Sequence, residues 1–421
     1  MHKSQFGLIG LGVMGQNLAL NIAEKGIHIS VYNRSEGAES EVVSDFISTN
    51  NQFSSIQGFT DIETFVNSLE TPRKIMLMVT AGEVVDQVIN DIIPYLSQED
   101  IIIDGGNSFF KDTIARNKRL KEHSLHYVGA GVSGGAKGAR TGPSIMPDGD
   151  QTTYGQVAPI LEIIAAKDQN GNPCCTYIGE SGSGHLVKMI HNGIEYAEMQ
   201  LLAETFALLS ENRTRQEVTE IFESWNATEL GSYLLEITIS ILKVKDGDHF
   251  LLDNILDAAA NKGTGSWSSK LALDLGCPDT MISSAVMARY ISALKSERSK
   301  YASKLNTDSN GSKCNDEVVK EGYRFARIIN HHQGFELIVE AAKNYNWEIT
   351  LSEVARIWTN GCIIRSKLME QSSETLNSSS SLMDNDHFFT LLKEGEAAVQ
   401  RTIKFAMEAR VSIPAFYGAY N

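Results

Sequence analysis

The first third of the chain alternates short apolar segments with stretches of helix-like periodicity. The apolar segments that fit buried strands are Phe6–Ile9, His28–Tyr32, Lys74–Val79, Ile101–Asp104 and His126–Val128. Strands separated by helical stretches are typical of parallel βαβ units. The pattern predicts a doubly wound, Rossmann-type α/β domain whose ligand lies at the carboxyl ends of the strands.

From about Gly184 onward the period changes, and long helical patterns dominate. His185–Asn212 contains no proline, which predicts one long helix. The polar segment Asn306–Asp316 is expected to form a surface loop, and Gln371–Ser381 is a second Ser/Asn-rich segment. We therefore expect a Rossmann-type N-terminal domain over residues 1–182, followed by a large all-α domain over residues 183–421.

Two parts of the helical region resemble each other. Ile190–Glu195 is similar to Ile329–Glu336, and Trp225-Asn226 recurs as Trp358-Thr359-Asn360. A duplicated helical unit explains this similarity, and so does chance resemblance between amphipathic helices. Both explanations stay open on the sequence alone.

Composition narrows the class of protein. The chain is 42% hydrophobic, and no segment approaches the roughly 18 unbroken apolar residues of a membrane span. A net charge of −15 argues against nucleic-acid binding, although a few basic groups in a pocket can still bind a small anion.

The N-terminus shows no secretory cleavage site, so we expect a cytoplasmic protein. The five cysteines are Cys174, Cys175, Cys277, Cys314 and Cys362. They form no CxxC pair, which favours reduced thiols and argues against a metal site.

A glycine-rich segment follows the first apolar strand directly and opens a helix expected to begin near Asn17. In a GxGxxG turn the first glycine permits a tight turn, the second lets a pyrophosphate approach, and the third allows close packing of helix on strand. The motif is weak alone, but here it has its strand–turn–helix context. The predicted cofactor-binding residues are Gly10, Leu11, Gly12, Val13, Met14 and Gly15.

The end of the second expected strand indicates which dinucleotide binds. An acidic residue there would bind the ribose 2′-hydroxyl of NAD, but this chain has Asn33, Arg34 and Ser35. A guanidinium can pair with a 2′-phosphate, and Asn33 avoids the repulsion of a carboxylate. NADP is favoured, although an arginine that merely begins a surface loop would give the same sequence.

Lys188, His191, Asn192 and Glu195 fall at i, i+3, i+4 and i+7 of the expected long helix. This spacing places all four on one face. A polar face of a helix is often simply solvated. The mixture of donors, acceptors and titratable groups is also compatible with a catalytic surface, and position alone leaves both interpretations open.

The segment His185–Tyr196 resembles the signature helix of 6-phosphogluconate dehydrogenases. Further segments that resemble this family follow in order along nearly the whole chain: Gly10–Asn17, Asn33–Ser35, Asp104–Ser108, Gly131–Gly135, Gly142–Pro147, Asn261–Gly265 and Gly361–Arg365. The resemblance implies NADP-dependent oxidative decarboxylation of 6-phosphogluconate to ribulose 5-phosphate, CO2 and NADPH by a homodimer.

The resemblance also implies roles for individual residues. Lys188 and Glu195 would be the acid–base pair, and Val79 and Asn107 would contact the cofactor. The residues implied to bind the small anionic sugar acid are Asn107, Ser133, Gly134, Gly135, His191, Asn192, Tyr196 and Arg289.

The sequence departs from the family pattern at several positions. Ser266 stands where the family usually has a phosphate-binding lysine, Ala136 replaces a glutamate, and Thr80 replaces a lysine near the cofactor. Loss of one charge-assisted hydrogen bond costs about 1.5–3 kcal/mol. Lys270, about one helical turn past Ser266, is a candidate substitute.

The largest departure is at the C-terminus. Family members usually continue past the region of Ile413–Phe416 with a tail that enters the neighbouring subunit, whereas this sequence stops at Asn421. Besides a working 6-phosphogluconate dehydrogenase, two alternatives stay open: a related dehydrogenase of another hydroxy acid, and an inactive NADP-binding homologue.

Overall fold

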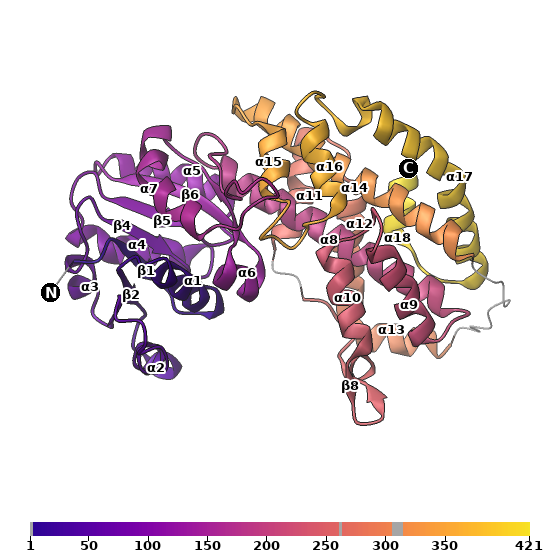
Figure 1. Ribbon diagram of the computed structural model, residues 1–421, viewed down its shortest axis with the longest axis horizontal. Helices are drawn as coiled ribbons and strands as arrows, with labels where there is room; N and C mark the ends of the chain where they lie inside the picture. The colour runs from indigo at the N-terminus through magenta and orange to yellow at the C-terminus, as the bar shows by residue number, and fades with distance from the viewer. Residues whose placement is uncertain (1–2, 261–262, 305–314) are drawn as a thin grey trace. The chain divides into compact units, whose positions relative to one another are not determined.

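The computed structural model describes residues 3–260, 263–304 and 315–421 (Figure 1). The chain forms two compact units, Met1–Lys188 with Tyr345–Ile363, and Met189–Asn344 with Ile364–Asn421. The first unit is an α/β fold, and the second consists mainly of helices. An α/β part followed by a helical part confirms the expected fold class.

The first unit is built on a seven-stranded sheet in the order β3-β2-β1-β4-β5-β6-β7. Neighbouring strands from β3 to β6 pair in parallel, and β7 is antiparallel to β6. The strands are β1 (Phe6–Ile9), β2 (Ile29–Tyr32), β3 (Ile56–Phe59), β4 (Lys74–Leu77), β5 (Ile101–Asp104), β6 (His126–Ser133) and β7 (Ser144–Pro147). All the strands predicted from the sequence are present.

Strands β3 and β7 were not predicted. They are the two edge strands, and β3 buries only the first of its four residues fully. An edge strand has a weaker apolar pattern than a central one, and β7 ends in Pro147, which sequence patterns associate with loops.

Side chains of successive residues in the central strands enter separate cores on the two faces of the sheet. Phe6 and Leu8 of β1 pack in the core that includes α1 (Val13–Glu24), α2 (Val42–Thr49) and α7 (Gln151–Ile164). Ile9 packs with α3 (Ile62–Asn67), α4 (Glu83–Ile92) and α5 (Phe110–Lys121) in the other core. This alternation produces the doubly wound arrangement, because a parallel sheet must be covered on both faces. Helix α1 begins at Val13, so the expectation of a start near Asn17 was wrong.

The remaining elements belong mainly to the second unit. The helices not yet given are α6 (Gly135–Thr141), α8 (Ser183–Ser210), α9 (Arg215–Asn226), α10 (Tyr233–Lys243), α11 (Thr264–Leu275), α12 (Thr280–Ala293), α13 (Lys295–Ala302), α14 (Asp316–Tyr345), α15 (Leu351–Ile357), α16 (Lys367–Thr375), α17 (Asp386–Ala409) and α18 (Pro414–Tyr420). A short hairpin joins β8 (Lys245–Asp246) to β9 (His249–Phe250). Single 3₁₀ turns form at Gly37–Glu39, Ile93–Tyr95, Leu251–Asn254 and Leu382–Asp384.

The helical expectations can be compared with these bounds. The single long helix expected over His185–Asn212 is α8, whose ends differ by two residues. Of the loop expected at Asn306–Asp316, residues 306–314 lie outside the described residues, and Asp316 already belongs to α14. The polar segment Gln371–Ser381 begins inside α16 and leaves it after Thr375.

A buried ion pair joins α8 to α14 in the core of the second unit. The Arg327 Nε atom lies 2.9 Å from Glu198 Oε2, and each side chain is only 2% exposed. Arg327 also donates to the Leu230 carbonyl at 2.9 Å, and Asn330 donates to the Ile194 carbonyl at 3.0 Å. A misplaced register between the two helices would leave these charges buried without partners, which is strongly unfavourable.

A second buried carboxylate, Glu204 of α8, caps helix α18. Its two oxygens accept hydrogen bonds from the backbone N–H groups of Ala415 at 2.9 Å and Phe416 at 3.1 Å. Gln200 donates to the same carboxylate at 2.9 Å. Burial raises the pKa of Glu204 to about 7, and the hydrogen bonds from Ala415, Gln200 and Phe416 oppose that rise.

This pKa makes stability depend on pH through Glu204. Because the folded-state pKa lies above the ordinary value of 4.5, the stabilisation is fully present below about pH 4.5 and is lost as the pH rises through about 7. Glu204→Gln removes this dependence. We expect the difference in free energy of unfolding, wild type minus variant, to fall by up to about 3 kcal/mol between pH 4.5 and 8 in urea titrations. The exposed Glu394→Gln serves as the control, and a difference that stayed constant with pH for Glu204→Gln would contradict the assignment.

Candidate functional site

The glycine turn after β1 has the geometry that a dinucleotide requires. Gly10 has a φ of +100°, and a Cβ there would lie 2.5 Å from the Met78 carbonyl oxygen. A Cβ on Gly15 would lie 1.9 Å from the Gly10 carbonyl oxygen, so α1 packs directly on the turn. At Gly12, by contrast, a Cβ would meet no atom within 4 Å.

The first residues of α1 are likewise not covered by other described parts of the protein. Gly12, its N-cap, provides no side-chain hydrogen bond, and the Val13 that follows is 68% exposed. The first N–H groups of a helix have no partners within the helix and carry a partial positive charge. Among the described residues, this turn therefore offers backbone donors and free space for a pyrophosphate.

The predicted residues after β2 are tied to the same turn. Asn33 accepts a hydrogen bond from the Leu11 amide at 3.0 Å and donates to Glu39 at 2.8 Å. Arg34 pairs with Glu39 at 2.8 Å, while its side chain remains 66% exposed. The hydrogen bonds from Arg34 and Asn33 hold the pKa of Glu39 below its ordinary value.

Glu39 was not predicted from the sequence, and it fixes Arg34 beside the glycine turn. Ser35 donates to the Ser40 carbonyl at 3.0 Å. The predicted Val79 also lies at the turn, because a Cβ on Gly10 would be 3.0 Å from its Cγ1. Met14 packs partly buried against the core of α1. The exposed guanidinium beside a glycine turn fits a dinucleotide that carries a 2′-phosphate.

The loop after β5 is held by the buried Asp104. Its carboxylate accepts hydrogen bonds from the Gly106 amide at 3.0 Å, from Ser108 at 2.6 Å and from the Tyr127 hydroxyl at 2.8 Å. These bonds leave Asn107 exposed at the carboxyl end of the sheet. That is the edge at which a doubly wound sheet binds its ligand.

The turn Ser133-Gly134-Gly135, after β6, lies where three backbone segments meet. Gly134 has a φ of +118°, and a Cβ there would be 2.4 Å from the Gly361 carbonyl oxygen. That carbonyl accepts a hydrogen bond from the Ser144 amide at 2.9 Å, and a Cβ on Gly361 would be 2.7 Å from the Gly142 carbonyl oxygen. Three segments that resemble the family in sequence thus meet in one place, which sequence spacing did not predict.

Lys188 lies on the part of α8 that belongs to the first unit. Its side chain is 6% exposed, and a Cβ on Gly131 of β6 would lie 2.4 Å from the Lys188 Cβ. The start of α8 is capped by Asp148, which accepts from the Gly129 and Gly184 amides at 3.0 Å each. Burial raises the pKa of Asp148 to about 8, and the bonds from Gly129, His185 and Gly184 oppose that rise. Asp148 was not predicted, because its partners are distant in the sequence.

The rest of the predicted polar stripe lies on the part of α8 in the second unit. The His191 Nδ1 atom is 3.3 Å from Asn192 Oδ1 and 3.7 Å from Glu195 Oε2. Both His191 and Asn192 are buried, and the Glu195 side chain is 21% exposed. Burial of most of the stripe argues against a simply solvated helix face.

Tyr196 and Arg289 come together in the second unit. The Arg289 guanidinium lies 3.7 Å from the centre of the Tyr196 ring, within the range of a cation–π interaction. A Cβ on Gly265 would come within 2.6 Å of the same ring. Glycine at this position of α11 therefore lets the helix pack closely against the ring.

The positions that depart from the family pattern are partly accessible. Ser266 is half-buried and donates to the Gly263 carbonyl at 2.7 Å. Lys270, the candidate substitute, is exposed on α11, and Thr80 and Ala136 are exposed in the first unit. Of the segment Asn261–Gly265, residues 261 and 262 lie outside the described residues.

Comparison with known proteins agrees with this geometry. The model of the NAD binding domain of 6-phosphogluconate dehydrogenase matches residues 5–179, and that of the 6-phosphogluconate dehydrogenase C-terminal domain matches residues 184–421. The decarboxylating 6-phosphogluconate dehydrogenase of Escherichia coli (strain K12) is 43% identical over 429 residues, covering 100% of this chain and 91% of the relative. The NADP(+)-dependent, decarboxylating relative of Bacillus subtilis (strain 168) is also 43% identical, over 433 residues with the same coverage.

The chain belongs to the 6-phosphogluconate dehydrogenase family. The resemblance on which the sequence prediction rested is thereby confirmed. A solved family member, the Plasmodium falciparum enzyme, superposes with a TM-score of 0.93 at 36% identity, covering 99% of this chain and 91% of that one. It was determined in its apo form, with its cofactor NADP+ and with its substrate 6-phosphogluconate.

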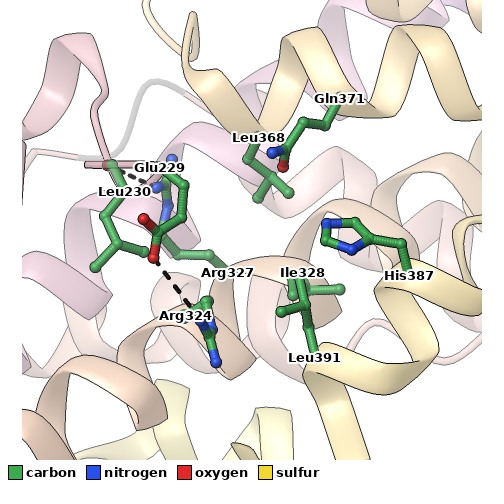
Figure 2. Close-up of a pocket in the computed structure, with 9 residues that line it drawn as sticks. All are labelled: Glu229, Leu230, Arg324, Arg327, Ile328, Leu368, Gln371, His387 and Leu391. Carbon is green, nitrogen blue, oxygen red and sulfur yellow. Dashed lines mark hydrogen bonds and ion pairs between the residues drawn. The ribbon is translucent and has the colours of Figure 1, made fainter. Parts of the chain in front are cut away.

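A cavity of about 350 Å³ in the second unit is lined by Glu229, Leu230, Arg324, Arg327, Ile328, Leu368, Gln371, His387 and Leu391 (Figure 2). None of these lining residues was predicted to belong to the site. Within the described ranges, no group of three or more His, Cys, Asp and Glu side chains could hold a metal, and no helix is long and apolar enough to cross a membrane.

The glycine turn gives a matched pair of substitutions. Gly15→Ala places a methyl group against the Gly10 carbonyl, so we expect stability to fall by about 1–3 kcal/mol. Gly12→Ala meets no protein atom and should leave stability within about 0.5 kcal/mol of wild type, while the methyl group blocks the approach of a dinucleotide. Urea unfolding and fluorescence titration with NADP measure the two effects. Equal NADP affinity of Gly12→Ala and wild type would exclude the turn as the pyrophosphate site.

Proposed function

We propose that this chain catalyses the NADP-dependent oxidative decarboxylation of 6-phosphogluconate to ribulose 5-phosphate, CO2 and NADPH. The observation that carries the proposal is the match over the whole chain, at 43% identity, to relatives named for this reaction. The cofactor and the small anionic substrate are those bound by the solved Plasmodium falciparum relative.

The first unit supplies the residues that would hold NADP. The amides of Leu11 to Gly15 would bind the pyrophosphate, and Asn33, Arg34 and Ser35 would bind the 2′-phosphate. Val79 and Asn107 would lie beside the nicotinamide half. When bound, NADP accepts a hydride from C3 of the sugar acid.

Lys188 would act first as a general base. As the neutral amine it takes the proton from the C3 hydroxyl while the C3–H bond is broken, which gives a 3-keto acid. As the ammonium it then stabilises negative charge on the C3 oxygen while the C1–C2 bond breaks and CO2 leaves. Its buried stem against Gly131 supports this role, because a fixed amine needs little reorganisation before it reacts.

Glu195 would act as the acid that completes the reaction. It protonates the enediol at the carbon that was C2 of the sugar acid, and this carbon becomes C1 of the ketopentose phosphate. Glu195 lies two helical turns from Lys188, so both face the same side of α8. Asn107, Ser133, Gly134, Gly135, His191 and Asn192 would bind the carboxylate and hydroxyls, and Tyr196 and Arg289 the phosphate.

We propose that the two functions, cofactor binding and substrate binding, are assigned to consecutive parts of the chain. Residues 1–182 would form the NADP-binding domain, and residues 183–421 the substrate and dimerisation domain. The matched family models support this division, because one ends at residue 179 and the other begins at residue 184. Duplication within the helical part stays a prediction.

Exposed apolar side chains support the further proposal of a homodimer. Met287, Ile291 and Leu294 follow one another at i, i+4 and i+7 along and just past α12, and each is more than half exposed. Leu273 of α11 is 80% exposed. Such apolar surfaces typically mark protein–protein contacts, and a second copy of the chain would bury them in a two-fold interface.

Light scattering tests the homodimer. We expect a mass of twice the 46.3 kDa of one chain, and Ile291→Glu should shift it toward the monomer, because a buried unpaired charge is strongly unfavourable. Met407→Glu, on an exposed position of α17, is the matched control. A monomeric wild type at micromolar concentration would contradict the proposal.

We also propose a cytoplasmic location. Four cysteines, Cys174, Cys175, Cys277 and Cys362, are free thiols in the described part of the chain. Free, buried thiols are typical of a reducing compartment. Fractionation of cells that produce the protein would test the location.

An activity assay with a lysine variant tests the reaction. The purified protein should reduce NADP and release equimolar CO2 with 6-phosphogluconate. Lys188→Met should lower kcat by about 10²–10⁴-fold, because a general base is lost, while NADP affinity is retained. Lys118→Met changes an exposed lysine of α5 and should keep wild-type activity.

Reduction of NADP without release of CO2, or turnover only with unphosphorylated acids, would point to another hydroxy-acid dehydrogenase. NADP binding without any turnover would reject catalysis altogether.

A further inference from the structure

The fully buried Asp148, directly after β7, links strand β6 to the first turn of α8. Its Oδ1 atom accepts a hydrogen bond from the Gly129 amide of β6, and its Oδ2 atom accepts one from the Gly184 amide, each at 3.0 Å. The His185 amide donates to Oδ2 at 3.4 Å. The Asp148 amide in turn donates to the Gly129 carbonyl at 2.7 Å. One side chain thus holds the strand and the helix at a fixed separation.

Helix α8 lies very close to the sheet at two positions one turn apart. A Cβ on Gly184 would be 2.2 Å from the Met146 carbonyl oxygen of β7. A Cβ on Gly131 of β6 would be 2.4 Å from the Lys188 Cβ. Gly184 and Lys188 are four residues apart and therefore share a face of the helix. Any roll or shift of the first turn must move the stem of Lys188 along β6.

We infer that Asp148 is a positioning residue, whose carboxylate sets the roll and axial position of the first turn of α8 and thereby the place of the Lys188 amine. The inference rests on the proposed role of Lys188. In the ionised form of Asp148 its hydrogen bonds from backbone amides are charge-assisted, and such bonds are shorter and stronger than those between neutral groups. The contact of His185 Nδ1 with Thr113 Oγ1 at 2.7 Å joins the same turn to α5, but it does not reach β6.

Asp148→Asn is the first test. At a pH above the Asp148 pKa of about 8, where the carboxylate is ionised and both of its oxygens accept, the variant keeps the shape of the side chain but replaces one oxygen by an NH2 group. That group must face either the Gly129 amide or the amides of Gly184 and His185, so donor faces donor. A displacement of the amine by about 1 Å is expected to lower kcat about 10²-fold. KM for 6-phosphogluconate and the dissociation constant of NADP should stay near wild type. A general loss of folding would instead change all three quantities.

Asp150→Asn is the matched control. Asp150 also caps a helix, accepting from the Thr152 amide at 3.0 Å and the Thr153 amide at 3.1 Å at the start of α7. Helix α7 carries no candidate site residue. Both variants should lower the melting temperature, but only Asp148→Asn should lower kcat. Equal loss of kcat in the two variants, or an unchanged kcat in folded Asp148→Asn, would overturn the inference.

Amide hydrogen exchange gives a readout that needs no turnover. Asp148→Asn should accelerate exchange in the peptide that spans residues 184–190, and Asp150→Asn only at the start of α7. Unchanged exchange over residues 184–190 would refute the link. If Asp148→Asn does not fold, Asp148→Ser keeps one acceptor and should show the same pattern with a smaller loss of kcat. The two proposals can fail separately. If the wild type binds NADP but does not oxidise 6-phosphogluconate, while the exchange rates of the two variants still differ from wild type as described, the proposed function is rejected and the link through Asp148 is retained.

Discussion

The close contact between the first turn of α8 and strand β6 is the constraint that fixes the place of the Lys188 side chain in the first unit. A helix can lie this near a strand only where one of the two backbones lacks side chains, and Gly131 and Gly184 provide those positions. The stem of Lys188 is thereby held against β6. The same helix α8 also carries His191, Asn192 and Glu195 further along its length.

Buried carboxylates that accept backbone hydrogen bonds hold the starts of three segments of the chain. Asp104 holds the loop that presents Asn107, Asp148 holds the start of α8, and Glu204 holds the start of α18. Each carboxylate satisfies N–H groups that would otherwise be buried without partners. Because such groups are costly to bury unpaired, these contacts specify one arrangement of the loop or helix more strongly than apolar packing does.

Much of this architecture could be predicted from the sequence, because its determinants are local. The glycine turn and the spacing of Lys188, His191, Asn192 and Glu195 are set by residues close together in the chain. The edge strand β3, the pairing of Arg34 with Glu39 and the cap from Asp148 to Gly184 could not be predicted. Strand β3 and the cap from Asp148 depend on segments brought together by folding, and a lone acidic residue after a short strand carries no signal of its distant partner. Glu39 is only five residues from Arg34, but an irregular connecting segment has no periodicity that would indicate the pair. The start of α1 was placed too late because glycine has low helix propensity, whereas here Gly15 is required for packing on the turn.

The charge of the chain illustrates the same difference between global and local properties. A protein with a net charge of −15 repels anions on average, yet the cofactor and the substrate proposed for this chain are both anionic. The residues proposed to bind these ligands include few full charges. Backbone amides at the start of α1 provide partial positive charge without any basic side chain, and Arg34 and Arg289 are each held in place, by Glu39 and by the Tyr196 ring. Oriented dipoles and fixed guanidinium groups act over a few ångströms, whereas the field of the surface acidic residues is screened by salt within about 10 Å. The sign of the total charge therefore says little about which ligand the chain binds, because oriented N–H groups and a few fixed guanidinium groups act at short range.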